Sequence, residues 1–259
     1  MAHHRTTLVT GASRGIGQGI VRALLQEPST TVIAAVRDLS PEACSSLRAL
    51  PKCTGAQLII IKIDAAISSD AAEAIVILKR DYAINSLDIV IANAGIAHSG
   101  TTVLKSSMES INNHFLVNTL GPVSLLQATA PLLKASKCDS PRFVVISSLV
   151  GSISGIDMLQ HLPPIVSPYG ASKAALNWFL RRVHFEERWL ITLAIHPGVV
   201  ATDFLSQEVS IPNSPNDSSL ALPISVEESV RGVLERINSV TKENGSGTFQ
   251  SYDDKLLPW

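Results

Sequence analysis

The stretch TGASRGIG, residues 10–17, decides the fold that this sequence predicts. It follows a short apolar run and precedes a segment with helical periodicity, so its glycines lie where a strand turns into a helix. Gly11 suits the tight turn, while Gly15 and Gly17 let the backbone approach a pyrophosphate, whose charge favours a helix N-terminus. The pattern predicts a dinucleotide-binding turn, and a plain glycine-rich turn is the alternative.

Short apolar runs alternate with helical segments throughout the chain. Seven strands are predicted, at Thr7–Thr10, Thr31–Val36, Gln57–Ile63, Leu87–Ala92, Arg142–Ser147, Leu190–Ile195 and Thr248–Tyr252. Six helices are predicted, at Gly15–Gln26, Pro41–Leu50, Ser69–Tyr82, Met108–Ala135, Tyr169–Arg188 and Val226–Asn238. Several strands are apolar at consecutive positions, as in a parallel sheet covered on both faces. We expect an α/β protein: a single Rossmann-fold domain over residues 1–259, with a doubly wound, mostly parallel seven-stranded sheet.

Composition narrows the class of protein. The 259 residues are 46% hydrophobic and 17% charged, which indicates a substantial core, and the net charge of -1 gives no reason to expect a nucleic-acid or membrane partner. Three cysteines without a C-x-x-C pattern argue against a disulfide framework or a metal site. The N-terminus lacks a signal-peptide stretch, and the apolar runs are too short to span a bilayer. A soluble, cytoplasmic protein is expected.

Tyr169 and Lys173 are spaced to share one face of a helix. A tyrosine hydroxyl, with an ordinary pKa of about 10, is a poor acid-base catalyst near neutrality, and a nearby ammonium favours the phenolate. Tyr169 could then deliver a proton to a ketone oxygen that Ser148, at the end of a strand, also hydrogen-bonds. Strand alternation points the neighbouring Ser147 to the opposite face. A Y-x-x-x-K pair alone is common on helix surfaces and does not indicate an active site. The order of glycine turn, asparagine, serine and Tyr-Lys pair along the chain is a much more specific indication.

Together these motifs resemble the short-chain dehydrogenase/reductase superfamily along nearly the whole chain. The resemblance includes Asn93-Ala94-Gly95 after the fourth strand, Asn118 in the next helix, and Pro197-Gly198 after the sixth strand. The stretch FEERWLITLAIHPGVVATD (residues 185–203) and the final LLPW (residues 256–259) also resemble fungal polyketide ketoreductases of the norsolorinic acid reductase kind.

The resemblance implies roles for particular residues. Its catalytic group is Asn118, Ser148, Tyr169 and Lys173, with Asn118 holding a water that links the lysine to solvent. Its cofactor-binding residues are Gly11, Ser13, Arg14, Gly15, Ile16, Gly17, Arg37, Asp64, Asn93, Ala94, Gly95, Tyr169, Lys173, Pro197, Gly198, Val200 and Thr202. Among these, Asp64 would contact the adenine amino group, with a helix N-cap as the alternative, and Thr202 would hold the nicotinamide carboxamide.

The end of the second strand predicts the choice of cofactor. An acid there would bind a ribose 2′-hydroxyl and select NAD, but the position holds Val36. Arg37 follows it, and Arg14 lies in the glycine turn, so two guanidinium groups could bind a 2′-phosphate. NADPH is therefore expected. Asp38 could serve NAD if the register were shifted by two, and each arginine could instead be a solvated surface charge.

Two long loops follow the carboxyl ends of strands. Residues 151–168 make the interval between Ser148 and Tyr169 longer than is usual in the family, and we expect this insertion to form one wall of the substrate pocket. Residues 203–225 are expected to form a mobile lid over the substrate. Ordinary packed surface loops are the alternative. His196 is expected to be a structural residue at a strand end.

The predicted function is reduction of a ketone to a secondary alcohol with NADPH, on a bulky apolar or aromatic, polyketide-like substrate. Alternatives are an NADP(H)-binding sensor without significant turnover, an alcohol dehydrogenase working in the oxidative direction, and an epimerase or dehydratase of the extended branch, which has a different glycine spacing. A small-molecule ketone is the expected partner. The family often forms homo-oligomers through the helices at Met108–Ala135 and Tyr169–Arg188, while the residues themselves leave the oligomeric state open.

Overall fold

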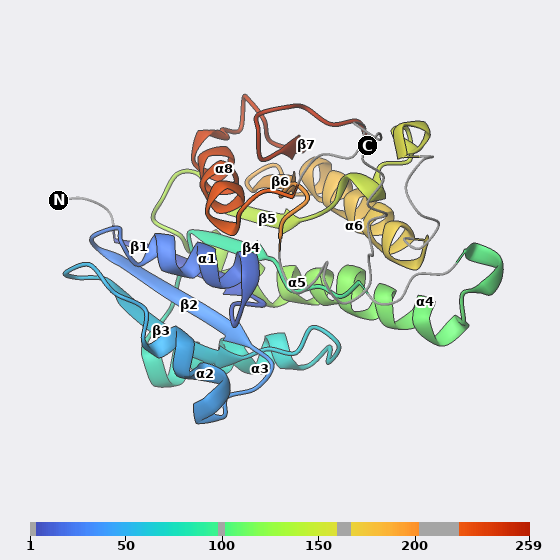
Figure 1. Cartoon of the computed structure of the whole chain (residues 1–259). Coiled ribbons are helices and arrows are strands. Elements are labelled where there is room, and N and C mark those ends of the chain that lie inside the picture. Colours follow the sequence, from blue (N-terminus) through green and yellow to red (C-terminus); the bar gives the residue numbers. More distant parts are fainter. Residues whose placement is uncertain (1–3, 98–101, 160–166, 202–222) are drawn as a thin grey trace.

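Seven parallel strands form one twisted sheet in the order β3-β2-β1-β4-β5-β6-β7 (Figure 1). The computed structural model describes residues 4–97, 102–159, 167–201 and 223–259. The strands are β1 (Arg5–Thr10), β2 (Thr30–Val36), β3 (Gln57–Lys62), β4 (Ile89–Ala92), β5 (Arg142–Ile146), β6 (Ile191–His196) and β7 (Thr248–Ser251). The prediction of a single α/β domain with a doubly wound seven-stranded sheet is confirmed.

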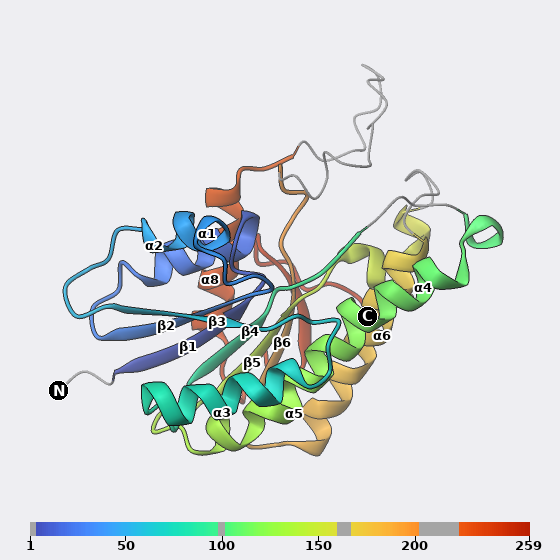
Figure 2. The same ribbon diagram turned by 90° about the horizontal axis from the view of Figure 1, so that it is seen from below.

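Helices cover the sheet in two layers (Figure 2). One layer holds α1 (Gly15–Leu24), α2 (Pro41–Arg48) and α8 (Val226–Ser239), and the other holds α3 (Asp70–Tyr82), α5 (Gly121–Lys134) and α6 (Ser167–Glu186). Each layer closes an apolar core against its face of the sheet. All seven residues of β2 are buried, as its continuous apolar character predicted.

The strand order places the site. β1 lies between β2 and β4, so the chain reverses direction across the sheet at the boundary between β1 and β4. In open parallel sheets a ligand crevice lies beyond the carboxyl ends of the strands at this reversal. Thr10 and Ala92 end these two strands, so the glycine turn and the segment that begins at Asn93 meet there.

The predicted helix Met108–Ala135 is not continuous. The structure has α4 (Met108–Phe115), a π-helical turn (η2, Leu116–Leu120) and then α5. Pro122 has no amide hydrogen to donate into the preceding turn, which disfavours regular α-helical bonding there. Gly121 also approaches the chain after β3 closely, because a Cβ at this position would lie 2.7 Å from the main-chain oxygen of Ala65.

The run Met108–Lys134 is long and apolar enough to cross a membrane by length and composition. In this fold, however, Leu125, Leu132 and Leu133 of α5 belong to the core beneath the sheet. The apolar character of this run is therefore that of a helix which covers a sheet.

Candidate active site

The glycine turn forms a cradle that larger residues would fill. A Cβ on Gly17 would lie 2.2 Å from the main-chain oxygen of Gly11, and Gly11 and Gly15 have positive φ angles of 63° and 56°. The first helix begins at Gly15, and the side chain of its N-cap residue Arg14 makes no capping hydrogen bond. Because the amide groups at a helix N-terminus point away from the helix, this position fits a bound phosphate group.

Asn93 holds the cradle in place. Its Nδ2 donates to the main-chain oxygens of Thr10 at 2.9 Å and Gly11 at 3.2 Å. The Thr10 hydroxyl in turn accepts from the backbone amides of Asn93 and Ala94, both at 3.1 Å. These hydrogen bonds hold the Asn-Ala-Gly segment against the glycine turn. They therefore stabilise the backbone conformation of the turn at which a dinucleotide would bind.

The end of β2 presents Arg37 beside this cradle. The amide of Ala12 donates to the main-chain oxygen of Ala35 at 3.2 Å, which places the glycine turn against β2. Arg37 is exposed, and within the described part of the chain no hydrogen bond or ion pair engages its guanidinium group. Arg14 is likewise exposed. Both arginines thus lie beyond the carboxyl ends of adjacent strands.

Asp38 is occupied by a structural task. Its carboxylate accepts from the amide of Ser40 at 2.8 Å and from the Ser40 hydroxyl at 2.9 Å, and these hydrogen bonds hold the pKa of Asp38 below its ordinary value. Ser40 is the N-cap of α2. Asp38 therefore supports the start of that helix, which weakens the alternative that it binds the ribose of NAD.

Asp64 follows β3 and accepts from the amide of Ala66 at 2.9 Å. The N-cap of α3 is Ser69, so the alternative assignment of Asp64 to that position is wrong. A narrow crevice opens near it, between three strand ends and α5, and is lined by Thr10, Ile63, Ala65, Ala92, Ala94, Gly121, Pro122 and Leu125. The crevice is too small for an adenine ring, and the expected contact of Asp64 with the adenine amino group stays a prediction.

Ser148, Tyr169 and Lys173 come together at the carboxyl end of β5. Ser148 is buried and hydrogen-bonds Tyr169 in the first turn of α6. The buried Nζ of Lys173 lies 5.8 Å from the centroid of the Tyr169 ring and donates to the main-chain oxygen of Ile146 at 2.8 Å. Ser147 instead donates to Asn177 Oδ1 at 2.6 Å, so it points away from Tyr169, as strand alternation predicts.

Burial sets the protonation states in this group. It raises the pKa of Tyr169 to about 12, and the hydrogen bond with Ser148 only partly opposes it. Burial also lowers the pKa of Lys173 to about 8. In the protein without a ligand, desolvation of the phenolate is the largest influence on the pKa of Tyr169, and it outweighs any stabilisation of the phenolate by the Lys173 ammonium. Tyr169 is a neutral phenol at pH 7 and holds a proton that it can give.

Asn118, in the π-helical turn, hydrogen-bonds both the segment after β4 and the helix α6. Its Oδ1 accepts from the amide of Ile96 at 2.8 Å, and its Nδ2 donates to the Ile96 oxygen at 2.9 Å and to the Ser172 hydroxyl at 3.0 Å. A Cβ on Gly95 would lie 3.2 Å from Asn118 Oδ1 and 3.7 Å from Lys173 Nζ. Asn118 thus ties the segment after β4 to α6, and its role in holding a water stays a prediction.

Comparison with known proteins agrees with this geometry. The profile of the short chain dehydrogenase family matches residues 5–211. The chain belongs to the short-chain dehydrogenase family. It is 36% identical to the norsolorinic acid ketoreductase of Dothistroma septosporum (98% of this chain, 93% of the relative) and 36% identical to that of Aspergillus parasiticus (97% and 90%). A crystal structure of NADPH-bound carbonyl reductase from chicken fatty liver superposes with a TM-score of 0.81 at 28% identity and full coverage of both chains.

In this short-chain dehydrogenase, the segment after β6 is shaped by Pro197 and Gly198. The Pro197 oxygen accepts from the Ser229 hydroxyl at 2.6 Å, and Gly198 has a φ of 86°. Val200 is buried and pairs with Ile224. Thr202 and residues 203–222 of the predicted lid lie outside the described residues, as do residues 160–166 of the predicted insertion.

Two contacts near Ser148 involve partners that the sequence did not indicate. His196 ends β6, as expected of a structural strand-end residue, and its Nδ1 accepts from the amide of Leu149 at 3.4 Å, while burial lowers the pKa of this imidazole to about 4. A Cβ on Gly151 would lie 2.7 Å from Lys173 Cβ, so the chain after Ser148 packs directly on α6. Both relationships join residues far apart in sequence, and periodicity carries no signal for them.

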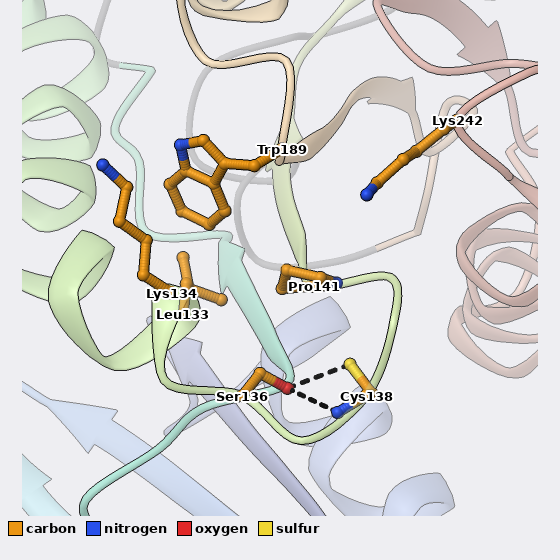
Figure 3. A pocket seen from close by; sticks show the side chains of 7 residues that line it. All are labelled: Leu133, Lys134, Ser136, Cys138, Pro141, Trp189 and Lys242. Carbon is orange, nitrogen blue, oxygen red and sulfur yellow. Dashed lines mark hydrogen bonds between the residues drawn. The ribbon is translucent and has the colours of Figure 1, made fainter.

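A separate hollow lies at the amino ends of the strands, away from the candidate active site at their carboxyl ends (Figure 3). It is lined by Leu133, Lys134, Ser136, Cys138, Pro141, Trp189 and Lys242. Pro141 precedes β5 and Trp189 precedes β6, so the hollow faces the amino ends of these strands. None of the described candidate site residues lines it, and its lysines and tryptophan are distinct from the group around Tyr169.

Proposed function

We propose that the chain reduces a ketone to a secondary alcohol with NADPH. The observation that carries this proposal is the convergence of Ser148, Tyr169 and Lys173 at the strand ends that also bear the glycine cradle. The exposed Arg14 and Arg37, with Asp38 engaged by Ser40, support NADPH over NADH. Similarity to an NADPH-bound carbonyl reductase supports the same choice.

The cradle and its neighbours would hold the cofactor. The glycine turn and the N-terminus of α1 suit its pyrophosphate, Arg14 and Arg37 its 2′-phosphate, and Asp64 its adenine. Asn93 to Gly95, Pro197, Gly198, Val200 and Thr202 complete the proposed cofactor-binding set, together with Tyr169 and Lys173. When bound, NADPH supplies a hydride for the carbonyl carbon.

The protein's own side chains would bind the ketone oxygen and supply the proton that it takes up. Ser148 and Tyr169 are placed to donate hydrogen bonds to one carbonyl oxygen, which orients the ketone and stabilises negative charge as it develops there. Tyr169 then gives its hydroxyl proton to that oxygen, and the alcohol is complete. The nearby ammonium of Lys173 stabilises the phenolate that remains until Tyr169 regains a proton.

A bulky apolar or aromatic ketone is the proposed substrate class. Two relatives over nearly the whole chain are named norsolorinic acid ketoreductases, which supports a polyketide-like substrate. In the segment after Ser148, Ile153 and Ile156 are 73% and 61% exposed, so apolar side chains are available to contact such a ligand.

Purified protein should be mixed with NADPH and a panel of ketones and quinones, and the products identified by mass spectrometry. We expect consumption of NADPH coupled to formation of a secondary alcohol. A sensor would bind NADPH without consuming it under any of these conditions. An enzyme of the oxidative direction would instead turn over NADP⁺ with secondary alcohols more efficiently.

We also propose that the chain associates with copies of itself. Met108 of α4 and Trp178 and Phe185 of α6 are large apolar residues that the single chain leaves mostly exposed. Exposed apolar residues on helices often mark an interface between copies. Light scattering coupled to size-exclusion chromatography would give the mass in solution, and a strictly monomeric mass would contradict this proposal.

A further inference from the structure

The C-terminal segment Leu256–Trp259 lies along the chain that follows Ser148. The Ser152 hydroxyl donates to the main-chain oxygen of Pro258 at 2.8 Å, and the amide of Ser154 donates to the main-chain oxygen of Trp259 at 2.9 Å. The Ser154 hydroxyl also hydrogen-bonds the Trp259 oxygen. Residues about a hundred positions apart in sequence are thus joined by three hydrogen bonds immediately beyond the candidate catalytic serine.

The far side of this segment is anchored in the core. The amide of Leu257 donates to the main-chain oxygen of Phe249 at 2.8 Å, and the rings of Trp259 and Phe249 lie 5.8 Å apart. Phe249 belongs to β7 and is fully buried. The guanidinium carbon of Arg181 on α6 lies 5.8 Å from the Trp259 ring centroid. The C-terminus therefore lies beside α6, as both views show (Figure 1, Figure 2).

Ser152 is the link between the two segments. Its buried hydroxyl donates to Pro258 and also accepts from the amide of Gly155 at 2.9 Å. A Cβ on Gly155 would lie 2.7 Å from that hydroxyl and 3.3 Å from Pro258 Cγ, so the contact is close-packed. The position of the turn at Ser152–Gly155 thus depends on where Pro258 lies.

The same stretch is held on its other side by the catalytic helix, because Gly151 packs against Lys173. The chain from Ser148 to Gly155 therefore lies between α6 and the C-terminal segment. Ile153 and Ile156 are largely exposed on it, although large apolar side chains gain stability when they are covered. An apolar ligand in the adjacent site could cover them.

We propose that Leu257, Pro258 and Trp259 form a positioning segment, which fixes the substrate wall after Ser148 and so sets the affinity for an apolar ketone. This inference rests on the proposed function. The ring of Trp259 packs against Phe249 and holds the segment in place. The hydrogen bond between Ser152 and Pro258 then fixes the turn after Ser148, and Ile153 and Ile156 on that turn contact the substrate. The segment touches neither the glycine cradle nor Arg37, which lie on the other side of the strand reversal, so we expect it to act mainly on the ketone and little on the affinity for NADPH.

Steady-state kinetics of three tail variants would test the proposal, with a bulky aromatic ketone that the wild type reduces. Trp259→Ala should raise the KM for this ketone by about tenfold, on the scale of one or two lost buried contacts, while KM for NADPH stays within about twofold. Trp259→Phe should restore most of the affinity because it keeps a ring against Phe249. Leu256→Ala is the matched control, because this neighbouring side chain is 71% exposed, and it should behave as wild type.

Ser152→Ala should raise the ketone KM in the same direction as Trp259→Ala. Parallel changes in both KM values, a loss confined to kcat, or equal effects of Trp259→Ala and Leu256→Ala would overturn the proposal. Amide hydrogen exchange separates this result from a failure of the proposed function. The amides of Ser154 and Gly155 should lose protection in Trp259→Ala and keep it in Leu256→Ala, even in a chain that reduced no ketone. Unchanged protection in Trp259→Ala would overturn the positioning role on its own.

Discussion

The Lys173 ammonium donates a 2.8 Å hydrogen bond to the main-chain oxygen of Ile146, the final residue of β5. Ser148 follows two residues later, and Tyr169 lies one helical turn before Lys173. One hydrogen bond therefore sets the distance between the strand that carries the serine and the helix that carries the tyrosine. The predictions below concern what this arrangement does with protons and which cofactor it accepts.

Tyr169→Phe should lower kcat for ketone reduction by roughly 10²- to 10⁴-fold, because the variant has no hydroxyl proton to give. NADPH affinity, measured by fluorescence titration, should stay near that of the wild type. Tyr82→Phe is the control, since Tyr82 is an exposed tyrosine on α3. Retention of most turnover in Tyr169→Phe would assign the proton donor to another residue.

The reduction rate should fall as the pH rises through about 8. Burial lowers the pKa of Lys173 to about 8, so above this value the lysine loses the charge that stabilises the Tyr169 phenolate. The measurement is the pH dependence of kcat from pH 6 to about 10. In Lys173→Arg the side chain keeps its charge throughout this range, and the fall near pH 8 should disappear even if the rate is lower at every pH. A wild-type rate that is constant to pH 10 would contradict this role.

Arg37→Ala should raise the KM for NADPH by about tenfold or more and leave NADH kinetics nearly unchanged, because the 2′-phosphate loses a charge-assisted partner. Arg48→Ala serves as the control, since Arg48 is an exposed arginine at the end of α2. Asp38→Asn should leave the cofactor preference as it is and weaken the start of α2. Equal or better wild-type efficiency with NADH would contradict the NADPH assignment.

His196 should make the protein sensitive to acid. Burial lowers its pKa from 6.5 to about 4, so between these values the unfolded chain binds more protons than the folded chain. The free energy of unfolding should therefore decrease as the pH falls from 6.5 to 4, by roughly 3 kcal/mol at most, and this contribution should be constant outside that window.

Urea denaturation at several pH values would measure this effect. His196→Gln cannot take up the proton, and its amide oxygen can still accept from Leu149, so its stability should depend less on pH between 6.5 and 4. His4→Gln changes an exposed histidine and should retain the wild-type slope. The same slope in all three proteins would show that His196 does not contribute.

Much of the fold could be predicted because buried parallel strands are continuous apolar runs. The bounds of β2 and β5 differ from the predictions by one residue, and the glycine turn begins where the spacing placed it. Ser148, Tyr169 and Lys173 were expected together because strand ends and a four-residue helical spacing bring such residues to one edge.

Properties that depend on tertiary environment could not be predicted. The direction of the Tyr169 pKa shift depends on how deeply the phenol is buried, and its distance from Lys173 in sequence does not reveal this. The support that Asp38 gives to Ser40, the N-cap of α2, depends on Ser40 folding back onto the Asp38 carboxylate. The contacts of Pro258 and Trp259 join segments about a hundred residues apart, and their hydrogen bonds involve main-chain atoms that every residue has.

The geometry of this site depends on the number of residues in the π-helical turn at Leu116–Leu120. This turn accommodates one residue more than an α-helical turn would, and each residue of an α-helix corresponds to about 100° of rotation. Deleting a single residue here would remove the extra residue of the π-helical turn and change the rotation between α4 and α5. Asn118 would then swing away from Ile96 and Ser172, or α4 would rotate relative to α5 by about a quarter turn. A deletion in this turn would therefore disrupt the site even if every side chain named above were kept.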